Sequence, residues 1–184
     1  RQLGFAEFSY PSATHNRYVH SLGAMRVATQ AFETIFGGPE TMPAQDADDR
    51  LRLGQTNPAA FARFRAATRL AAMLHDIGHG PLSHTTEFAM PEISKLKLPE
   101  WTGVSKGDRK ANHEDYTLKI ILDSGLTKIL DRAGESFGLK PRHIAGLIEP
   151  KLPMDDSFFE ETIGGKSVDF RPLLQQIISS ELDA

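Results

Sequence analysis

The feature that most constrains this sequence is a helical pattern that ends in a segment rich in histidine and glycine. Apolar residues recur at helical spacing over residues 57–74. Asn57-Pro58 is a favourable helix start, because Asn can cap a helix and Pro suits its first position. His75-Asp76 comes next, and Gly78 and Gly80 then allow the backbone to open. This order predicts a turn where adjacent side chains can converge on one point.

The remaining sequence also favours helices, so we expect an all-α fold. The helix over residues 57–74 should bury Phe61, Phe64, Leu70 and Leu74. Asn112 is placed to cap the helix that begins at His113, with Gly125 as its C-terminal stop. Met90–Lys110 reads as a loop, and Ser157–Lys166 leaves room for a small β-hairpin. The other expected helices are His20–Phe36, Leu82–Ala89, His113–Asp123, Leu126–Ala133, Pro141–Ile148 and one that starts near Phe170.

Composition narrows the possible classes of protein. The chain has 184 residues, a net charge of −3 and no cysteine. This length suits one domain, and the absence of cysteine excludes disulfides and thiolate chemistry. The charge gives no basis for nucleic-acid binding, and no apolar run approaches the roughly 20 residues of a membrane span. We expect a cytoplasmic domain over residues 1–184 that is truncated at both ends, because Arg1 is no natural start and Ala184 falls within a helical pattern.

The histidines are grouped. One group contains His15 and His20, and a second contains His75, His79 and His84. His113 is followed directly by a glutamate. An imidazole beside a carboxylate, as in His75-Asp76, is a ligand set for borderline divalent metals. A buried histidine paired with a capping aspartate is the alternative at this point.

Three segments carry a resemblance to a known family. Residues 15–23 read HNRYVHSLG, residues 74–84 read LHDIGHGPLSH, and residues 112–114 read NHE. This pattern resembles the HD-domain superfamily, and more narrowly the deoxynucleoside triphosphate triphosphohydrolases and their bacterial HD phosphohydrolase relatives. The resemblance covers roughly residues 1–120. It implies a helical bundle and a divalent metal cofactor, with Mn, Mg, Fe, Zn and Ni all open as its identity.

The resemblance implies the metal ligands. His20, the second histidine of HNRYVHS, matches one ligand, and His75 and Asp76 match the pair that gives the family its name. A fourth family ligand lies in a late motif of which Asp183 would be the first aspartate. By this alignment the ligand itself would be the residue after Ala184.

The resemblance also implies groups that bind the substrate. Arg17 matches an arginine that contacts phosphates, and a guanidinium suits this task because it is always charged and can hold two oxygens. Gln2 and Leu3 match a segment that contacts the deoxyribose, where a leucine against the sugar would exclude a 2′-hydroxyl. The substrate partner is accordingly a nucleotide, and the resemblance leaves a homo-oligomer as an expectation.

A second set of residues matches the catalytic machinery. His113, with Glu87 and Glu114 as neighbours, matches the acid/base group, since a carboxylate can orient an imidazole and raise its basicity. His79 and His84 match histidines near the phosphates. For Glu114 the alternative is a carboxylate that favours the helix dipole at the first turn.

The function implied by the resemblance is the hydrolysis of deoxynucleoside triphosphates to nucleoside and tripolyphosphate. A metal would lower the pKa of a water molecule, and Arg17 and the histidines would stabilise charge on the phosphoryl oxygens. Two alternatives remain. One is another HD phosphohydrolase that acts on a nucleoside monophosphate, cyclic nucleotide or alarmone. The other is a nucleotide-binding regulator with little turnover.

Overall fold

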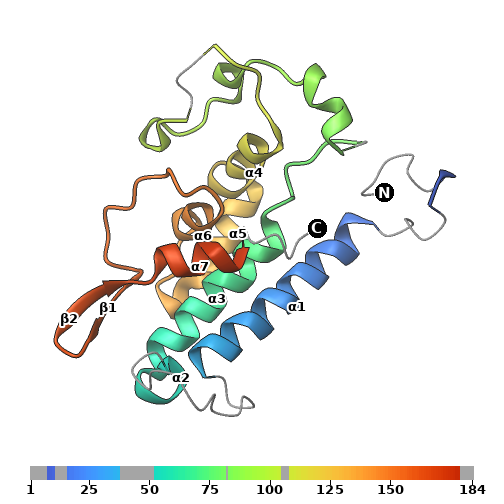
Figure 1. Ribbon diagram of the computed structural model, residues 1–184. Coiled ribbons are helices and arrows are strands. Elements are labelled where there is room, and N and C mark those ends of the chain that lie inside the picture. Colours follow the sequence, from blue (N-terminus) through green and yellow to red (C-terminus); the bar gives the residue numbers. More distant parts are fainter. Residues whose placement is uncertain (1–7, 11–15, 38–51, 82, 105–107, 179–184) are drawn as a thin grey trace.

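The predicted all-α fold with a small hairpin is confirmed. The computed structural model describes residues 8–10, 16–37, 52–81, 83–104 and 108–178. Its two longest helices, α1 (Arg17–Phe36) and α3 (Pro58–Leu74), pack side by side along most of their length (Figure 1). The short helix α2 (Leu53–Thr56) precedes α3. This pair forms the frame on which the other helices pack.

Helix α3 begins and packs as its sequence predicts. The Asn57 side chain accepts a hydrogen bond from the backbone N–H of Ala60, which caps the helix. Phe64 and Leu74 are buried, and Phe61 and Leu70 are half-buried against the same cluster. Because buried residues recur every three or four positions, one face of α3 enters the core.

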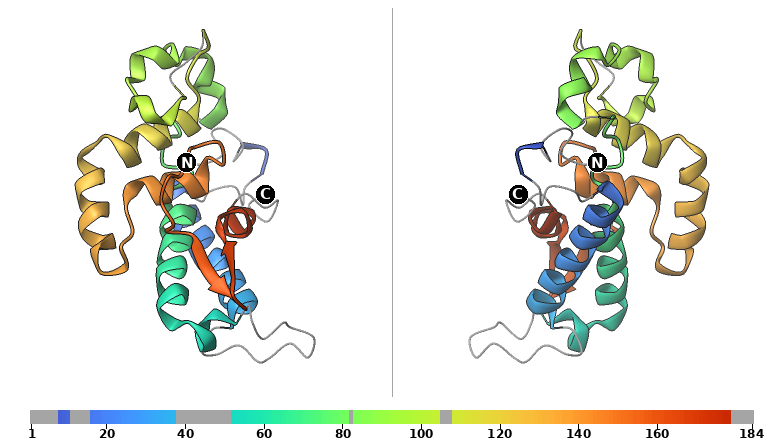
Figure 2. Two further views of the ribbon diagram at one scale, coloured as in Figure 1. Left: turned by 90° about the vertical axis from the view of Figure 1, so that its left-hand side faces the viewer. Right: turned by 90° about the vertical axis from the view of Figure 1, so that its right-hand side faces the viewer.

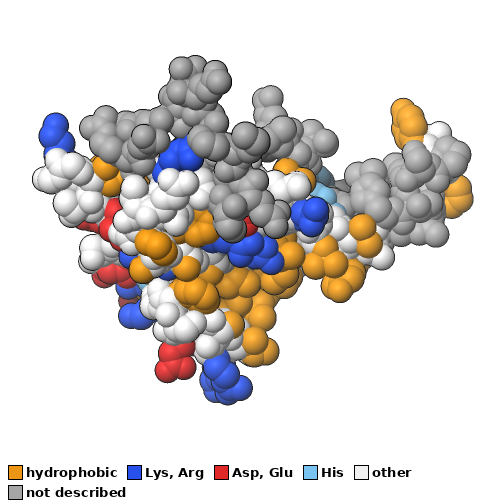
Figure 3. Space-filling model, turned by 90° about the horizontal axis from the view of Figure 1, so that it is seen from below, with side chains coloured by type: hydrophobic (Ala, Val, Ile, Leu, Met, Phe, Trp, Pro, Cys, Tyr) orange, Lys and Arg blue, Asp and Glu red, His pale blue; other side chains and the backbone are white. Residues whose placement is uncertain are grey.

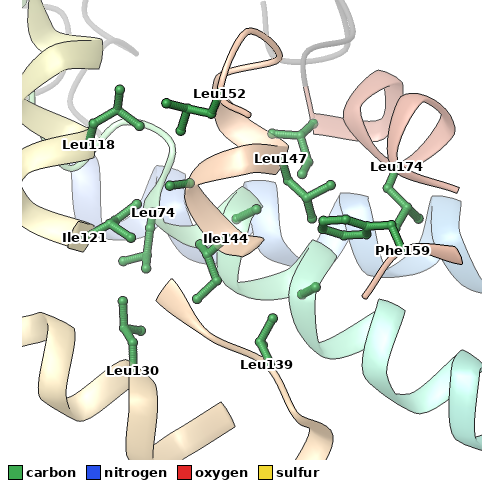
Figure 4. Packing of buried hydrophobic residues seen from close by; sticks show 14 of the residues in the cluster. Leu74, Leu118, Ile121, Leu130, Leu139, Ile144, Leu147, Leu152, Phe159 and Leu174 are labelled. Atoms are coloured by element: carbon green, nitrogen blue, oxygen red, sulfur yellow. The ribbon is translucent and has the colours of Figure 1, made fainter. Parts of the chain in front are cut away.

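The smaller helices close the core around α3. They are α4 (His113–Leu122), α5 (Gly125–Gly134), α6 (Pro141–Ile148) and α7 (Arg171–Ile178). Side chains from these helices and from the connecting segments meet in one hydrophobic cluster, shown in part in Figure 4. The strands β1 (Glu160–Ile163) and β2 (Lys166–Asp169) form an antiparallel hairpin that precedes α7.

The helix boundaries differ from those expected at the start of α1 and around Gly125. Helix α1 begins at Arg17, before the expected His20, because the Asn16 side chain accepts from the N–H of Val19 and caps it there. The prediction that Gly125 stops α4 is wrong: α4 ends at Leu122, and Gly125 is the first residue of α5. Ser124 caps α5, so two short helices follow each other with almost no linker.

Residues 83–104, which lie between α3 and α4, are more ordered than the expected loop. They contain the 3-10 helices η3 (Ser83–Ala89), η4 (Ile93–Leu96) and η5 (Glu100–Thr102). Buried side chains such as Ile93 and Leu98 tie the expected loop to the core. The segment covers one end of the bundle, above α4, in both views of Figure 2.

The surface of α1 also carries hydrophobic side chains. Tyr18, Val19 and Val27 are each about half exposed or more, and hydrophobic side chains gather on the face of the molecule seen in Figure 3. In the described part of the chain, no helix combines the length and the apolar composition that a membrane span requires.

Candidate active site

One group of side chains forms a candidate metal centre where α1 and α3 meet. His20 comes from the first turns of α1, and His75 and Asp76 directly follow α3. Their candidate ligand atoms all lie within 4.8 Å of one another. The Nε2 atoms of His20 and His75 lie 3.6 and 3.5 Å from the Asp76 carboxylate. All three side chains are at most 17% exposed, so the group is largely shielded from water.

The orientation of His75 suits a metal ligand. Its Nδ1 lies 2.7 Å from the carbonyl oxygen of Ala72, and a carbonyl can only accept, so Nδ1 carries the proton. The ring then directs its other nitrogen, Nε2, toward Asp76. Histidines that bind metals commonly donate their other ring N–H in this way. The donor set of two imidazoles and a carboxylate therefore fits a divalent metal.

Arg17 lies against this group. Its guanidinium donates from one nitrogen to Asp76 Oδ2 at 3.0 Å and from the other to the Ser83 hydroxyl at 2.9 Å. The side chain is 23% exposed. The arginine expected to contact phosphates is thus placed beside the candidate metal ligands.

A second group adjoins the first and consists of His79, His84, Glu87 and His113. One oxygen of Glu87, Oε1, lies 2.5 Å from His113 Nδ1 and 3.0 Å from His84 Nδ1. Ligands of a tetrahedral metal with bonds of roughly 2.0–2.1 Å would lie about 3.3 Å apart. The shorter distances indicate hydrogen bonds that both imidazoles donate to one carboxylate.

The charge of Glu87 follows from these bonds. Partial burial alone would raise its pKa, but the hydrogen bonds from His113 and His84 outweigh this, and the pKa is lowered. Glu87 is therefore an anion at neutral pH. Its oxygen accepts a hydrogen bond from Nδ1 of His113, so the proton of that ring lies on Nδ1 and Nε2 is left without this partner.

His79 connects the two groups but differs in its protonation. Its ring stacks on His113, with centroids 3.8 Å apart and an angle of 9°, and its Nε2 lies 3.5 Å from Asp76. Burial, and then the nearby charge of His113, lower the pKa of His79 to about 4. A ring that is neutral at this position is unsuited to donate a proton at neutral pH.

A hydroxyl joins the turn after α3 to α4. Thr117 accepts a hydrogen bond from the N–H of Gly78 at 3.0 Å and donates one to the carbonyl of His75 at 2.9 Å. A Cβ on Gly78 would lie 2.1 Å from the carbonyl oxygen of His113, so only glycine fits there. The two groups of side chains are thus held in a fixed relation through the backbone.

The structure does not bring together every residue expected at the site. Glu114 is exposed, and among its described contacts its carboxylate accepts from the side chain of Asn112. It stands apart from the imidazole of His113, because adjacent helical residues point in different directions. Gln2, Leu3, His15 and Asp183 lie outside the described residues.

Two residues near the site were not expected from the sequence. Ser83 lies inside the HGPLSH segment, and its place in that motif is the feature of the sequence that could have identified it. Thr117 lies one helical turn after His113, where no motif marks it.

Comparisons with known proteins identify a family and several relatives. The model of the HD domain family matches residues 17–150. The chain is 28% identical over 130 residues to the deoxynucleoside triphosphate triphosphohydrolase SAMHD1 homolog of Dictyostelium discoideum. It is 38% identical over 148 residues to an uncharacterized protein of Methanocaldococcus jannaschii, and 29% identical over 150 residues to the uncharacterized protein YwfO of Bacillus subtilis. These alignments cover 68%, 68% and 80% of this chain, but only 20%, 27% and 25% of the relatives.

Proposed function

The chain belongs to the HD domain family, and from this premise we propose that it hydrolyses deoxynucleoside triphosphates to nucleoside and tripolyphosphate. The observation that carries the proposal is the contact between two groups of side chains. One group is a histidine and aspartate ligand set, and the other is an imidazole bonded to a carboxylate. Together they provide a metal ligand set beside a proton donor, which phosphate ester hydrolysis requires.

His20, His75 and Asp76 would hold the metal. A divalent ion bound there would polarise a phosphate oxygen and lower the pKa of a water molecule. The Asp76 carboxylate forms an ion pair with the Arg17 guanidinium at 3.0 Å. The site therefore combines a cation-binding carboxylate with a phosphate-binding guanidinium.

The chain's own residues provide the remaining steps. Arg17 binds and orients the phosphate oxygens and stabilises the charge that develops on them. As an oxygen from water bonds to the α-phosphorus, the bond from phosphorus to the 5′-oxygen breaks. His113 Nε2 delivers a proton to that leaving oxygen, and Glu87 holds the ring in place through its hydrogen bond with Nδ1.

The choice of a deoxynucleoside triphosphate as substrate rests on the relatives whose names state that activity, at 25–28% identity in Dictyostelium discoideum, Gallus gallus and Homo sapiens. The chain spans less than a third of those relatives' lengths. The preferred base, any regulatory nucleotide and assembly into oligomers are properties of the whole protein. The single domain expected over residues 1–184 likewise stays a prediction.

A product assay tests the proposal. We would incubate the protein with each of the four deoxynucleoside triphosphates, with Mn²⁺ and separately with Mg²⁺, and resolve nucleoside, tripolyphosphate, pyrophosphate and phosphate. Nucleoside plus tripolyphosphate is the expected result. An Asp76→Ala preparation made in parallel detects contaminating phosphatases. Nucleoside monophosphate plus pyrophosphate would indicate another phosphohydrolase, and no turnover would indicate a nucleotide-binding regulator.

A further inference from the structure

Ser83 has a backbone conformation that residues with a side chain rarely adopt. Its φ is +58°, and Lys97, at +50°, is the other non-glycine residue with a positive φ in the described ranges. This left-handed conformation costs free energy that glycine would not require. Strained residues of this kind persist where the surrounding structure holds them, and they are concentrated at functional sites.

The turn that contains Ser83 is held from both sides. The N–H of Ser83 donates to the carbonyl of Gly80 at 3.2 Å. The hydroxyl of Thr86 donates to the carbonyl oxygen of Pro81 at 2.7 Å. The same hydroxyl lies 3.1 Å from the backbone carbonyl oxygen of Ser83. These bonds fix the position of the Ser83 side chain relative to the turn after α3.

The Ser83 hydroxyl accepts a hydrogen bond from Arg17. One guanidinium nitrogen reaches Ser83 Oγ at 2.9 Å, and the other reaches Asp76 Oδ2 at 3.0 Å. Two acceptors on separate turns define the plane of a guanidinium, whereas one would allow it to rotate. The remaining N–H groups of Arg17 are then aimed from a fixed position beside the metal ligands.

We propose that Ser83 is a positioning residue for phosphate binding, which acts by holding the Arg17 guanidinium in place. The strained backbone of Ser83 is the conformation that directs its hydroxyl toward Arg17. The inference rests on the proposed function through the phosphate-binding role of Arg17, but its test does not require turnover.

The variant Ser83→Gly separates stability from binding. Glycine accepts a positive φ without strain but has no hydroxyl. We expect the melting temperature to stay equal or rise. The affinity for inorganic tripolyphosphate, measured by calorimetry in the presence of Mn²⁺, should fall on the order of tenfold, as expected for one lost hydrogen bond to a charged group. A residue with only a structural role would leave this affinity unchanged.

Three further variants complete the test. Ser83→Ala keeps the strain and lacks the hydroxyl, so it should lose the same affinity and melt below Ser83→Gly. Lys97→Gly is the matched control, because it relieves a positive φ at an exposed residue and should leave the affinity unchanged. In an Arg17→Lys background, Ser83→Gly should have no additional effect, since the pair acts as a unit.

The outcomes distinguish this inference from the proposed function. Wild-type affinity in Ser83→Gly, or an equal loss in the Arg17→Lys background, would overturn the inference. Absence of tripolyphosphate binding by the wild-type protein would also overturn it. Binding that depends on Ser83, without hydrolysis of any deoxynucleoside triphosphate, would support the inference and refute the proposed function. If hydrolysis occurs, KM should rise by a similar factor in Ser83→Gly.

Discussion

At the scale of single residues, one oxygen of Glu87 accepts hydrogen bonds from both His84 and His113. His84 is 68% exposed, whereas His113 is 17% exposed. A hydrogen bond to a carboxylate is stronger where water is excluded, so Glu87 acts mainly on His113. This difference favours His113 over His84 for the acid/base role that we propose.

Replacement of His113 should therefore separate catalysis from metal binding. We expect His113→Ala to lose turnover by about a hundredfold or more, the usual contribution of a general acid, and to bind metal with wild-type stoichiometry. Product release and metal content, measured on the same preparation, check this. Turnover at the wild-type rate would remove His113 from the acid/base role.

The same residues show what the sequence could predict. The motifs predicted that His20, His75 and Asp76 belong to one metal site. In the structure their candidate ligand atoms all lie within 4.8 Å of one another. The choice between Glu87 and Glu114 as the partner of His113 depended on which carboxylate the fold brings to the ring. The sequence named both carboxylates as neighbours of His113, and adjacency does not bring Glu114 to the ring because neighbouring helical side chains diverge.

At the scale of elements, the turn after α3 is joined to α4 by the hydroxyl of Thr117. The side chain is buried and satisfies both the N–H of Gly78 and the carbonyl of His75. Loss of that hydroxyl would remove the acceptor of the buried N–H of Gly78 and the donor to the carbonyl of His75.

Thr117→Val should consequently be destabilised by about 2–4 kcal/mol, although valine has nearly the same shape. Thr117→Ser keeps the hydroxyl and should lose only about 1 kcal/mol, for the missing methyl group. Urea denaturation of both variants measures the difference. Equal stability of the two would show that the hydroxyl does not join these elements.

The connection between α6 and the hairpin should respond to pH through His143. Its ring is 2% exposed, with Nδ1 accepting from the N–H of Lys140 and Nε2 donating to Asp156 at 2.9 Å. Burial is the main cause that lowers the pKa of His143, and the charge of Arg142 adds to it, against the opposing effect of Asp156.

Because its folded pKa is lowered, His143 takes up a proton more readily in the unfolded chain. Stability is unaffected above the unfolded pKa of about 6.5 and falls as pH decreases below it, by up to about 1.4 kcal/mol per pH unit. His143→Gln should remove this component. Thermal denaturation of both proteins from pH 7.5 to 5.5 compares the slopes, and parallel slopes would contradict the assignment.

Elements were predictable where local chemistry decides them. Pro141–Ile148 matches the expected helix at both ends, and Asn57 and Asn112 cap the helices they were expected to cap. The 3-10 helices at Ile93–Leu96 and Glu100–Thr102 were not predictable, because their order comes from distant packing of residues such as Ile93 rather than from local preference.

At the scale of the whole molecule, the candidate site joins segments that are far apart in the sequence. The start of α1, the turn after α3 and the start of α4 meet at one end of the bundle (Figures 1 and 2). Periodicity predicts each helix, but the convergence of their ends depends on how α1 and α4 pack around α3. A ligand that contacts these ends at once should therefore stabilise the complete fold.

A divalent metal held by His20, His75 and Asp76 would join two of these ends, since His20 belongs to α1 whereas His75 and Asp76 follow α3. Binding only to the folded state at a hundred times Kd contributes about 2.7 kcal/mol, or an increase in melting temperature on the order of 5–10 °C for a chain of this size. Mn²⁺ added after EDTA treatment should produce this increase in the wild-type protein and in His143→Gln. Asp76→Ala should show none, because it lacks the carboxylate that both histidines approach. An increase retained in Asp76→Ala would place the metal elsewhere, while a wild-type protein indifferent to Mn²⁺ would refute a metal shared between the two helices.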